Sequence, residues 1–240
     1  MNRGLMQGLY PGFSMPPAVS YSRAVLNRNP TGLYMLDEKS GTEVLDSSGN
    51  NRHGAYQNGA VPVFPGMVNE SSRSLNAVSN LFAKVPGGVA EAINGFSLAL
   101  WLQFSHTTNL LILERNQNTG YSLQTFDSST GGAGTIGFVT GGGTPKRWLQ
   151  SSIAINDGIP HCAVFTFGGT PASSYLYIDG IDRSTRPESG GTPSYGATTV
   201  WDVGSRNGTA ALNGRLGGLA IFPYLLTAED AKLLFEAGSA

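Results

Sequence analysis

Residues 96–104 read Phe-Ser-Leu-Ala-Leu-Trp-Leu-Gln-Phe, and this stretch decides the fold class. Large apolar side chains occupy every second position from 96 to 104. Successive side chains of a β-strand point to opposite faces, so the stretch predicts a strand with one face packed into a core. A period of two, rather than the 3.6 of a helix, indicates a chain built from sheets.

Shorter apolar stretches on both sides of this segment predict further strands. They cover residues 110–113, 136–139, 163–167, 175–178 and 219–222. The run at 110–113 is continuously apolar, which is typical of a strand buried on both sides. A Gly-Gly-Thr-Pro loop joins 163–167 to 175–178 and predicts antiparallel neighbours. Asp179-Gly180 predicts a tight turn after them, and Pro223 ends the last strand.

One helix is expected at the end of the chain. Thr227 is a good N-cap, and Asp230 three residues later completes an acidic capping box. Gly238 is placed just past the expected helix end. The helix is expected to pack on the sheets through the apolar side chains of Leu233, Leu234 and Phe235.

Composition limits the classes of function. The 240 residues carry a net charge of -1 and only 13% charged residues, with no basic stripe, so we expect no nucleic-acid partner. Cys162 is the only cysteine, which excludes an intrachain disulfide. No apolar run reaches the ~18 residues of a membrane span. Glycine and proline interrupt the first 20 residues, so no signal peptide is predicted.

We divide the chain into an N-terminal arm, residues 1–29, and one β domain, residues 30–240. The arm mixes Gly and Pro with apolar side chains and shows no sustained period. Two interpretations stay open: a disordered tail, or a docking arm that orders against a neighbouring subunit or lattice, since apolar side chains without a partner favour aggregation. The docking residues under the second interpretation are Leu5, Tyr10, Phe13, Tyr21 and Arg23.

Four segments together resemble the laminin-G-like branch of the concanavalin A-like lectin and glucanase superfamily. They are residues 34–54 with the turn Asp-Ser-Ser-Gly-Asn-Asn-Arg-His-Gly at 46–54, residues 96–104, residues 161–180 ending in Leu-Tyr-Ile-Asp-Gly, and residues 213–230. The resemblance covers about residues 31–238. It implies an all-β fold: a two-sheet, antiparallel, jelly-roll-like sandwich with a short C-terminal helix and an extended N-terminal arm. Gly218 and Leu219 depart from the acidic and apolar residues usual in the family's last strand.

We predict no catalytic residues. A retaining glucanase needs two carboxylates ~5–5.5 Å apart, which alternate residues of one strand supply. No Glu-x-Asp-x-Glu strand is present. His53, His106 and His161 lack zinc-ligand spacing, so no metal site is assigned to them. We interpret His161 as a strand-end residue and Cys162 as an inert buried thiol.

Two ligand questions stay open in the sequence. The turn beginning at Asp46 is interpreted either as a simple turn or as a calcium site of the kind the resemblance allows; its single carboxylate favours the turn. Sugar sites often stack an aromatic ring on the sugar. The loop-proximal aromatic candidates for such a site are Tyr121, Trp148, Tyr195 and Trp201, each weighed against plain core packing.

The leading hypothesis is a non-enzymatic bacteriophage virion surface protein, such as a decoration or fibre protein. Its arm would dock to the major capsid protein or another virion protein, and its lectin-like domain would bind a cell-surface glycan. A homo-oligomer, for example a trimer, would be natural for it. The alternatives are a free extracellular bacterial carbohydrate-binding or adhesion module and, last, a glycoside hydrolase of the same fold.

Overall fold

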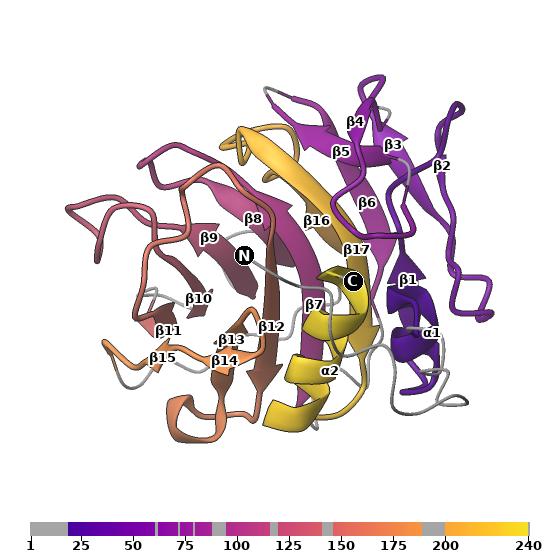
Figure 1. The fold of residues 1–240 in the computed structure, drawn as a ribbon. Helices are drawn as coiled ribbons and strands as arrows, with labels where there is room; N and C mark the ends of the chain where they lie inside the picture. The colour runs from indigo at the N-terminus through magenta and orange to yellow at the C-terminus, as the bar shows by residue number, and fades with distance from the viewer. Residues whose placement is uncertain are drawn as a thin grey trace, which may run out of the picture.

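The chain folds into a sandwich of two antiparallel sheets, with helices on the outer side of one of them (Figure 1). The structure is a computed structural model. It describes residues 19–60, 62–71, 73–78, 80–87, 95–115, 120–140, 146–188 and 200–239. The expected all-β, jelly-roll-like sandwich is therefore confirmed.

The first sheet has eight strands, with β7 near its middle. Its order is β14-β13-β12-β7-β17-β5-β4, and β1 pairs with β17. The strands are β1 (Gly32–Tyr34), β4 (Phe64–Pro65), β5 (Arg73–Ala77), β7 (Phe96–Gln103), β12 (His161–Phe167), β13 (Tyr175–Ile178), β14 (Ile181–Asp182) and β17 (Gly214–Phe222).

The second sheet has nine strands, and its order is β15-β11-β10-β9-β8-β16-β6-β3-β2. The strands are β2 (Glu43–Val44), β3 (Gly54–Gln57), β6 (Phe82–Pro86), β8 (Leu111–Arg115), β9 (Tyr121–Thr125), β10 (Ile136–Thr140), β11 (Lys146–Ser151), β15 (Ser184–Thr185) and β16 (Val200–Val203). A short 3-10 helix, η2 (Pro171–Ser173), stands between β12 and β13.

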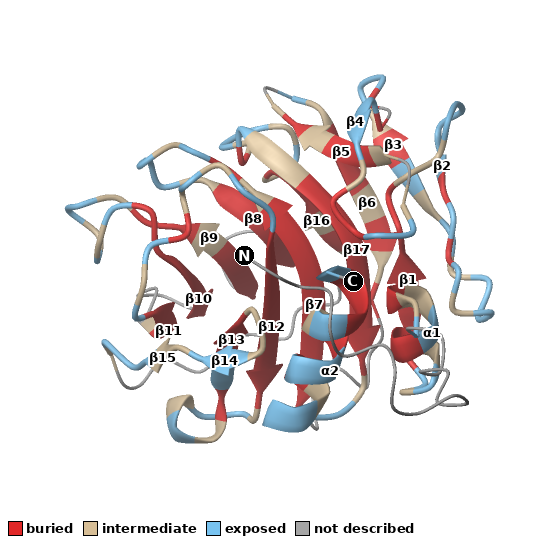
Figure 2. Cartoon of the chain, viewed as in Figure 1, coloured by how far each residue is buried: buried red, intermediate tan, exposed pale blue. Residues whose placement is uncertain are grey.

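Strand β7 confirms the strand predicted at 96–104. The alternating pattern predicted one buried face, whereas both faces of β7 are buried. Phe96, Leu98, Leu100 and Leu102 face the core between the sheets. The opposite face is also buried, because Ala99 and Trp101 belong to a second apolar cluster on the outer side of the sheet. Figure 2 shows β7, β12 and β17 as a buried block.

The other predicted strands are also found. Strands β12 and β13 pair antiparallel, with Ala163 opposite Ile178. The turn at Asp179-Gly180 has φ angles of 51° and 75°, which is the left-handed geometry of a tight hairpin turn. All five residues of β8 are buried, as a continuously apolar start suggested.

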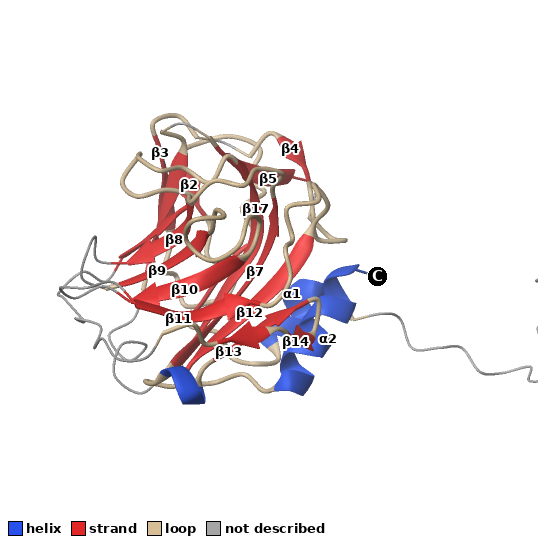
Figure 3. Ribbon diagram, turned by 90° about the vertical axis from the view of Figure 1, so that its left-hand side faces the viewer, coloured by secondary structure: helices blue, strands red, loops and turns tan. Residues whose placement is uncertain are grey.

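Two helices, α1 (Tyr21–Leu26) and α2 (Ala228–Ser239), cover the outer face of the eight-stranded sheet (Figure 3). Tyr21, Val25 and Leu234 are fully buried in the second apolar cluster with Trp101. The expected arm, residues 1–29, therefore includes a segment from residue 19 onward that packs on the folded domain. Residues 1–18, with Leu5, Tyr10 and Phe13, lie outside the described residues.

The capping box of α2 forms as predicted. The Thr227 backbone N–H donates to Asp230 Oδ2 at 2.9 Å, and the Asp230 N–H donates to Thr227 Oγ1 at 3.1 Å. Two details of the expectation are wrong. Leu233 is 39% exposed, because the buried stripe runs through Ala231, Leu234 and Ala237. Gly238 lies inside the helix, where a Cβ would come within 2.5 Å of the Trp101 ring.

Candidate functional site

The outer face of the nine-stranded sheet carries polar side chains, and none of the described helices lies on it. Leu123, Phe138 and Leu149 point into the core between the sheets. Their neighbours along each strand point the other way, so that Ser122 stands opposite Val139 and Val139 opposite Arg147. This polar face is the candidate binding surface.

A pocket of about 320 Å³ opens on this face over β9, β10 and β11. Six of its eight lining residues are polar. The lining is formed by Asn109, Gln124, Phe126, Ser129, Thr130, Val139, Arg147 and Glu188. Its volume lies at the low end of the range of small-molecule sites.

The floor of the pocket depends on a glycine in β10. A Cβ at Gly137 would lie 2.6 Å from Cε2 of Phe126, so only glycine lets this ring lie against the sheet. Phe126 is fully buried, and the guanidinium of Arg147 lies over its ring at 6.0 Å. Phe126 therefore forms the floor of the pocket and is not a ring on which a ligand stacks.

One wall of the pocket is a loop held together by Asp127. Its Oδ1 accepts hydrogen bonds from the hydroxyls of Ser129 at 2.7 Å and Thr130 at 2.8 Å, and from both backbone N–H groups. The same hydrogen bonds lower the pKa of Asp127 below the usual carboxyl value. Thr130 Oγ1 also accepts the Asp127 N–H at 3.1 Å, so Asp127 and Thr130 hold the loop by hydrogen bonds in both directions.

The facing wall is an ion pair. Arg147 Nε donates to Glu188 Oε1 at 2.9 Å, and Arg147 Nη1 donates to the Thr130 carbonyl. Both side chains are a little over a quarter exposed. Because β11 supplies Arg147 and the segment after β15 supplies Glu188, this ion pair exists only once the sheet edge has formed.

Beside the pocket, two carboxylates face each other across strands. Glu114 of β8 stands opposite Asp202 of β16. Arg206 Nε lies 2.8 Å and 3.0 Å from the two oxygens of Glu114. Asp202 accepts the Asn207 N–H at 2.8 Å and lies 3.7 Å from Lys84 Nζ. Both carboxylates therefore already have partners within the protein.

This cross-strand pair was missed by a search within single strands. Carboxylate oxygens accept hydrogen bonds, so this arrangement can bind hydroxyl groups.

Comparison with known protein families identifies the fold family. The family model described as "Concanavalin A-like lectin/glucanases superfamily", of the Laminin_G_3 type, matches residues 81–232, which is more than half of the chain. The chain belongs to this superfamily. No curated protein matches it at a significant level.

Among solved structures, this lectin-like chain is similar to the binding domains of clostridial toxins. The botulinum neurotoxin serotype D binding domain matches with a TM-score of 0.65 and 15% identity, over 88% of this chain and 52% of that one. The binding domain of Paraclostridial Mosquitocidal Protein 1 gives 0.64 and 17%, over 88% and 52%. The botulinum neurotoxin DC binding domain, solved in complex with rat synaptotagmin II, gives 0.61 and 14%, over 89% and 52%. At these identities the likeness shows the fold, and the chain spans about half of each neighbour.

The aromatic residues proposed from the sequence as sugar platforms do not form the site of this lectin-like domain. Tyr121, Trp148 and Trp201 are at most 3% exposed and lie in the core between the sheets. A ring packed on both faces cannot stack on a ligand, so the prediction is wrong for these three. Tyr195 lies outside the described residues. The pocket residues were missed because single Asn, Gln, Ser and Thr residues carry no sequence signal.

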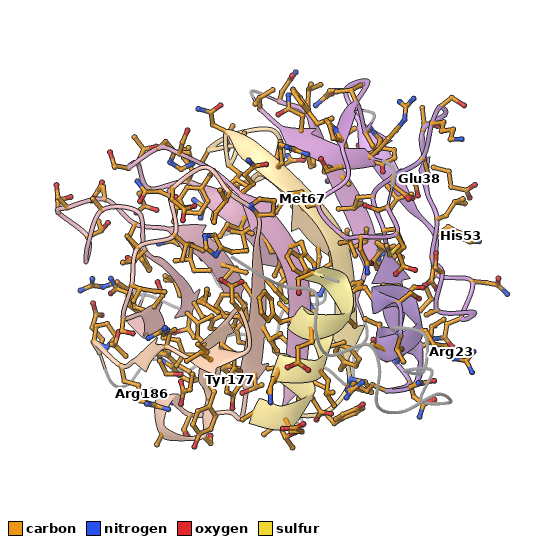
Figure 4. The ribbon with its side chains drawn as sticks, viewed as in Figure 1. Arg23, Glu38, His53, Met67, Tyr177 and Arg186 are labelled. Carbon is orange, nitrogen blue, oxygen red and sulfur yellow. The ribbon has the colours of Figure 1, made fainter. Side chains whose placement is uncertain are left out.

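Of the proposed docking residues, Tyr21 and Arg23 are described. Tyr21 is fully buried and donates its hydroxyl to the Gly218 carbonyl at 2.6 Å, so its role as a partner-docking residue is wrong. Gly218 has a φ of 58°, and a Cβ there would lie 2.9 Å from Cε1 of Tyr21. The departure from the family pattern at 218 is thus explained by the packing of α1. Arg23 is exposed, on the outer side of α1 (Figure 4).

A second hollow, of about 490 Å³, lies between α1 and α2 on the opposite side of the sandwich. Val19, Ala24, Leu233 and Ala237 give it an apolar lining, and the ion pair between Arg28 and Asp230 stands at its rim, with Nε and Oδ1 2.8 Å apart. None of the described helices is long and apolar enough to cross a membrane.

The turn at Asp46 is a structural turn. Oδ1 of Asp46 accepts the N–H groups of Leu33 at 3.1 Å and Ser48 at 2.9 Å, and Oδ2 accepts that of Arg52 at 3.0 Å. Burial alone would raise the pKa of Asp46, but these hydrogen bonds outweigh it and lower the pKa. Both oxygens are already in use, so the turn does not fit calcium, and the described residues hold no cluster suited to a metal ion.

His161 joins two carboxylates at the start of β12. Its Nδ1 lies 2.7 Å from Asp179 Oδ2 and its Nε2 lies 3.1 Å from Asp157 Oδ1. The hydrogen bond to Asp179 raises the pKa of His161 in spite of burial, and Asp157 adds to the shift. Burial also raises the pKa of the Cys162 thiol, which agrees with an inert buried cysteine.

Proposed function

We propose that this chain is a non-enzymatic, lectin-like binding domain that recognises a glycan in the pocket over β9, β10 and β11. The observation that carries the proposal is the pocket itself: six polar side chains around about 320 Å³, on the sheet face that no described helix covers. Sugar hydroxyls both donate and accept hydrogen bonds, and the pocket offers both kinds of partner.

Binding without catalysis is supported by the partners of the nearby carboxylates. Glu114 is held by Arg206, and Asp202 by Lys84 and the Asn207 backbone. Both side chains are thus engaged within the protein. The similar solved structures are described as binding domains, which agrees with this interpretation.

For the biological setting, we propose display on a virion surface, with residues 1–18 as the attachment segment to a capsid or other virion protein. Large apolar residues recur in this part of the sequence. The described chain begins at Val19, which lines the apolar hollow between α1 and α2, away from the glycan pocket. Attachment and glycan binding would then use opposite sides of the sandwich.

A glycan array tests the binding function. The full chain, labelled with a fluorophore, should bind a subset of neutral or acidic oligosaccharides, and Gln124→Ala should reduce that binding about tenfold, the cost of one lost buried hydrogen bond. The control is Gln57→Ala, on β3 at the far end of the same sheet. Equal binding by both variants, or turnover of any β-glucan by the full chain, would contradict the proposal.

Mass spectrometry of purified particles tests the setting. The chain should be present in intact virions from the source, and deletion of residues 1–18 should abolish its incorporation while glycan binding persists. Free secretion of the chain without any particle would favour the bacterial adhesion module instead.

A further inference from the structure

We infer that the pocket prefers an uncharged, hydroxyl-rich sugar residue over an acidic one, such as a uronic or sialic acid, and that the ion pair between Arg147 and Glu188 sets this preference. The inference rests on the proposed function, because it concerns the same pocket. It adds the chemical class of the ligand and the residue pair that selects it.

The uncharged part of the lining matches sugar hydroxyls. Asn109 is exposed and Gln124 is half-buried, and each side-chain amide offers two donor N–H bonds and an acceptor oxygen. The Ser129 and Thr130 hydroxyls give their protons to Asp127 at 2.7 Å and 2.8 Å, so their oxygens can act toward a ligand only as acceptors. One lone pair of Thr130 Oγ1 already accepts the Asp127 N–H at 3.1 Å, which leaves one for a ligand. A hydroxyl group can pair with every one of these groups.

The charged part of the lining is balanced. Arg147 and Glu188 are the two residues with formal charge among the eight that line the pocket, and their Nε and Oε1 atoms are 2.9 Å apart. Asp127, directly behind the loop wall, adds one negative charge. An anionic sugar would therefore meet no net positive charge and would approach two carboxylates.

The geometry of Arg147 leads to the same preference. Recognition of a carboxylate by arginine is strongest when two N–H groups meet its two oxygens in parallel. Two of the three guanidinium nitrogens are already used, Nε by Glu188 and Nη1 by the Thr130 carbonyl. The remaining nitrogen, Nη2, has no partner in the described part of the chain, and it suits a single hydroxyl oxygen.

The test uses the full chain and matched ligands: a neutral oligosaccharide and the same oligosaccharide with a terminal sialic or uronic acid, titrated by saturation-transfer NMR. The wild type should bind the neutral ligand more tightly. Glu188→Gln removes one negative charge and keeps the size of the side chain, so the ratio of neutral to acidic affinity should shift about tenfold toward the acidic ligand. Added salt should leave neutral binding unchanged.

Two further variants keep the result interpretable. Glu229→Gln, an exposed carboxylate on α2, removes the same charge far from the pocket and should leave the ratio unchanged. Arg147→Gln should shift the ratio in the opposite direction, away from the acidic ligand. Thermal melting of each variant shows whether it is folded.

The outcomes separate the inference from the proposed function. If the wild type prefers the acidic ligand, or if Glu188→Gln behaves like Glu229→Gln, the inference is wrong and the glycan-binding function stands. If the folded wild type binds no oligosaccharide of either class, both are wrong. A neutral preference that reverses in Glu188→Gln and strengthens in Arg147→Gln supports both.

Discussion

The two outer faces of this sandwich differ in what covers them. On the eight-stranded sheet, the side chains of Trp101, Cys162 and Val164 point outward and are buried beneath α1 and α2. On the nine-stranded sheet, the outward residues include Gln124 and Arg147, which are only partly buried, and no described helix lies on them. The chain covers its apolar face with its own helices and leaves its polar face open to a ligand.

The largest expected loss of stability comes from a substitution in the apolar cluster beneath α1 and α2. Trp101→Ala removes the ring that stacks on Phe235 at 6.0 Å and meets Tyr21 edge-on at 6.5 Å. The free energy of unfolding in urea should fall by about 3–5 kcal/mol. Gln124→Ala, on the open face, should change it by less than about 0.5 kcal/mol. Similar losses in the two variants would show that the faces do not differ as described.

A smaller effect is expected from the charges beside the pocket. Arg206→Ala removes the guanidinium from Glu114, whose side chain is only 5% exposed. Because Arg206 is itself about one-third exposed, solvent screens the pair, and we expect a loss of about 1–3 kcal/mol in unfolding free energy. Glu114→Gln in the Arg206→Ala background should recover part of the loss. Simple additivity of the two changes would argue against coupling.

A loss near 1 kcal/mol is expected where α1 meets the sheet. Tyr21→Phe removes the hydroxyl that donates to the Gly218 carbonyl at 2.6 Å and leaves that buried acceptor without this partner. Urea unfolding measures the change. If the variant were as stable as the wild type, the hydrogen bond between Tyr21 and Gly218 would contribute nothing to the free energy of unfolding.

The smallest effect concerns pH. The pKa of His161 is raised in the folded state, so its contribution to stability is fully present below pH about 6.5 and is lost as the pH rises through the folded-state pKa. The unfolding free energy of the wild type should therefore decline across that window relative to His161→Asn. Parallel pH profiles for the two proteins would show that Asp157 and Asp179 do not stabilise the imidazolium.

The strands were predictable because each depends on local alternation. The apolar positions of β7 and the capping box of α2 lie within nine and four residues, respectively, so the sequence pattern contains all the information they need. The carboxylate pair beside the pocket was not predictable, for the opposite reason. Glu114 and Asp202 are far apart in sequence and meet only because β8 and β16 pair.

The aromatic candidates show the same limit. Tyr121, Trp148 and Trp201 stand at strand starts or beside loops, where sequence pattern cannot tell which face a side chain will take. Strand register sends all three rings into the core, and for Trp148 the bulge in the pairing of β10 with β11 allows it to share the core with its neighbour Leu149. The same register sends Arg147 outward to Glu188 and the pocket.

The sequence by itself determined the all-β class, the superfamily resemblance, the terminal helix and the lack of a disulfide. These follow from side-chain periodicity and capping, which depend on a few neighbouring residues, and from composition, which is a property of the whole chain. Only the tertiary structure decided that α1 belongs to the domain, that Gly218 receives Tyr21, and that five separate segments build one polar pocket. Such contacts depend on strand order and register, which are set by the packing of the two sheets as a whole.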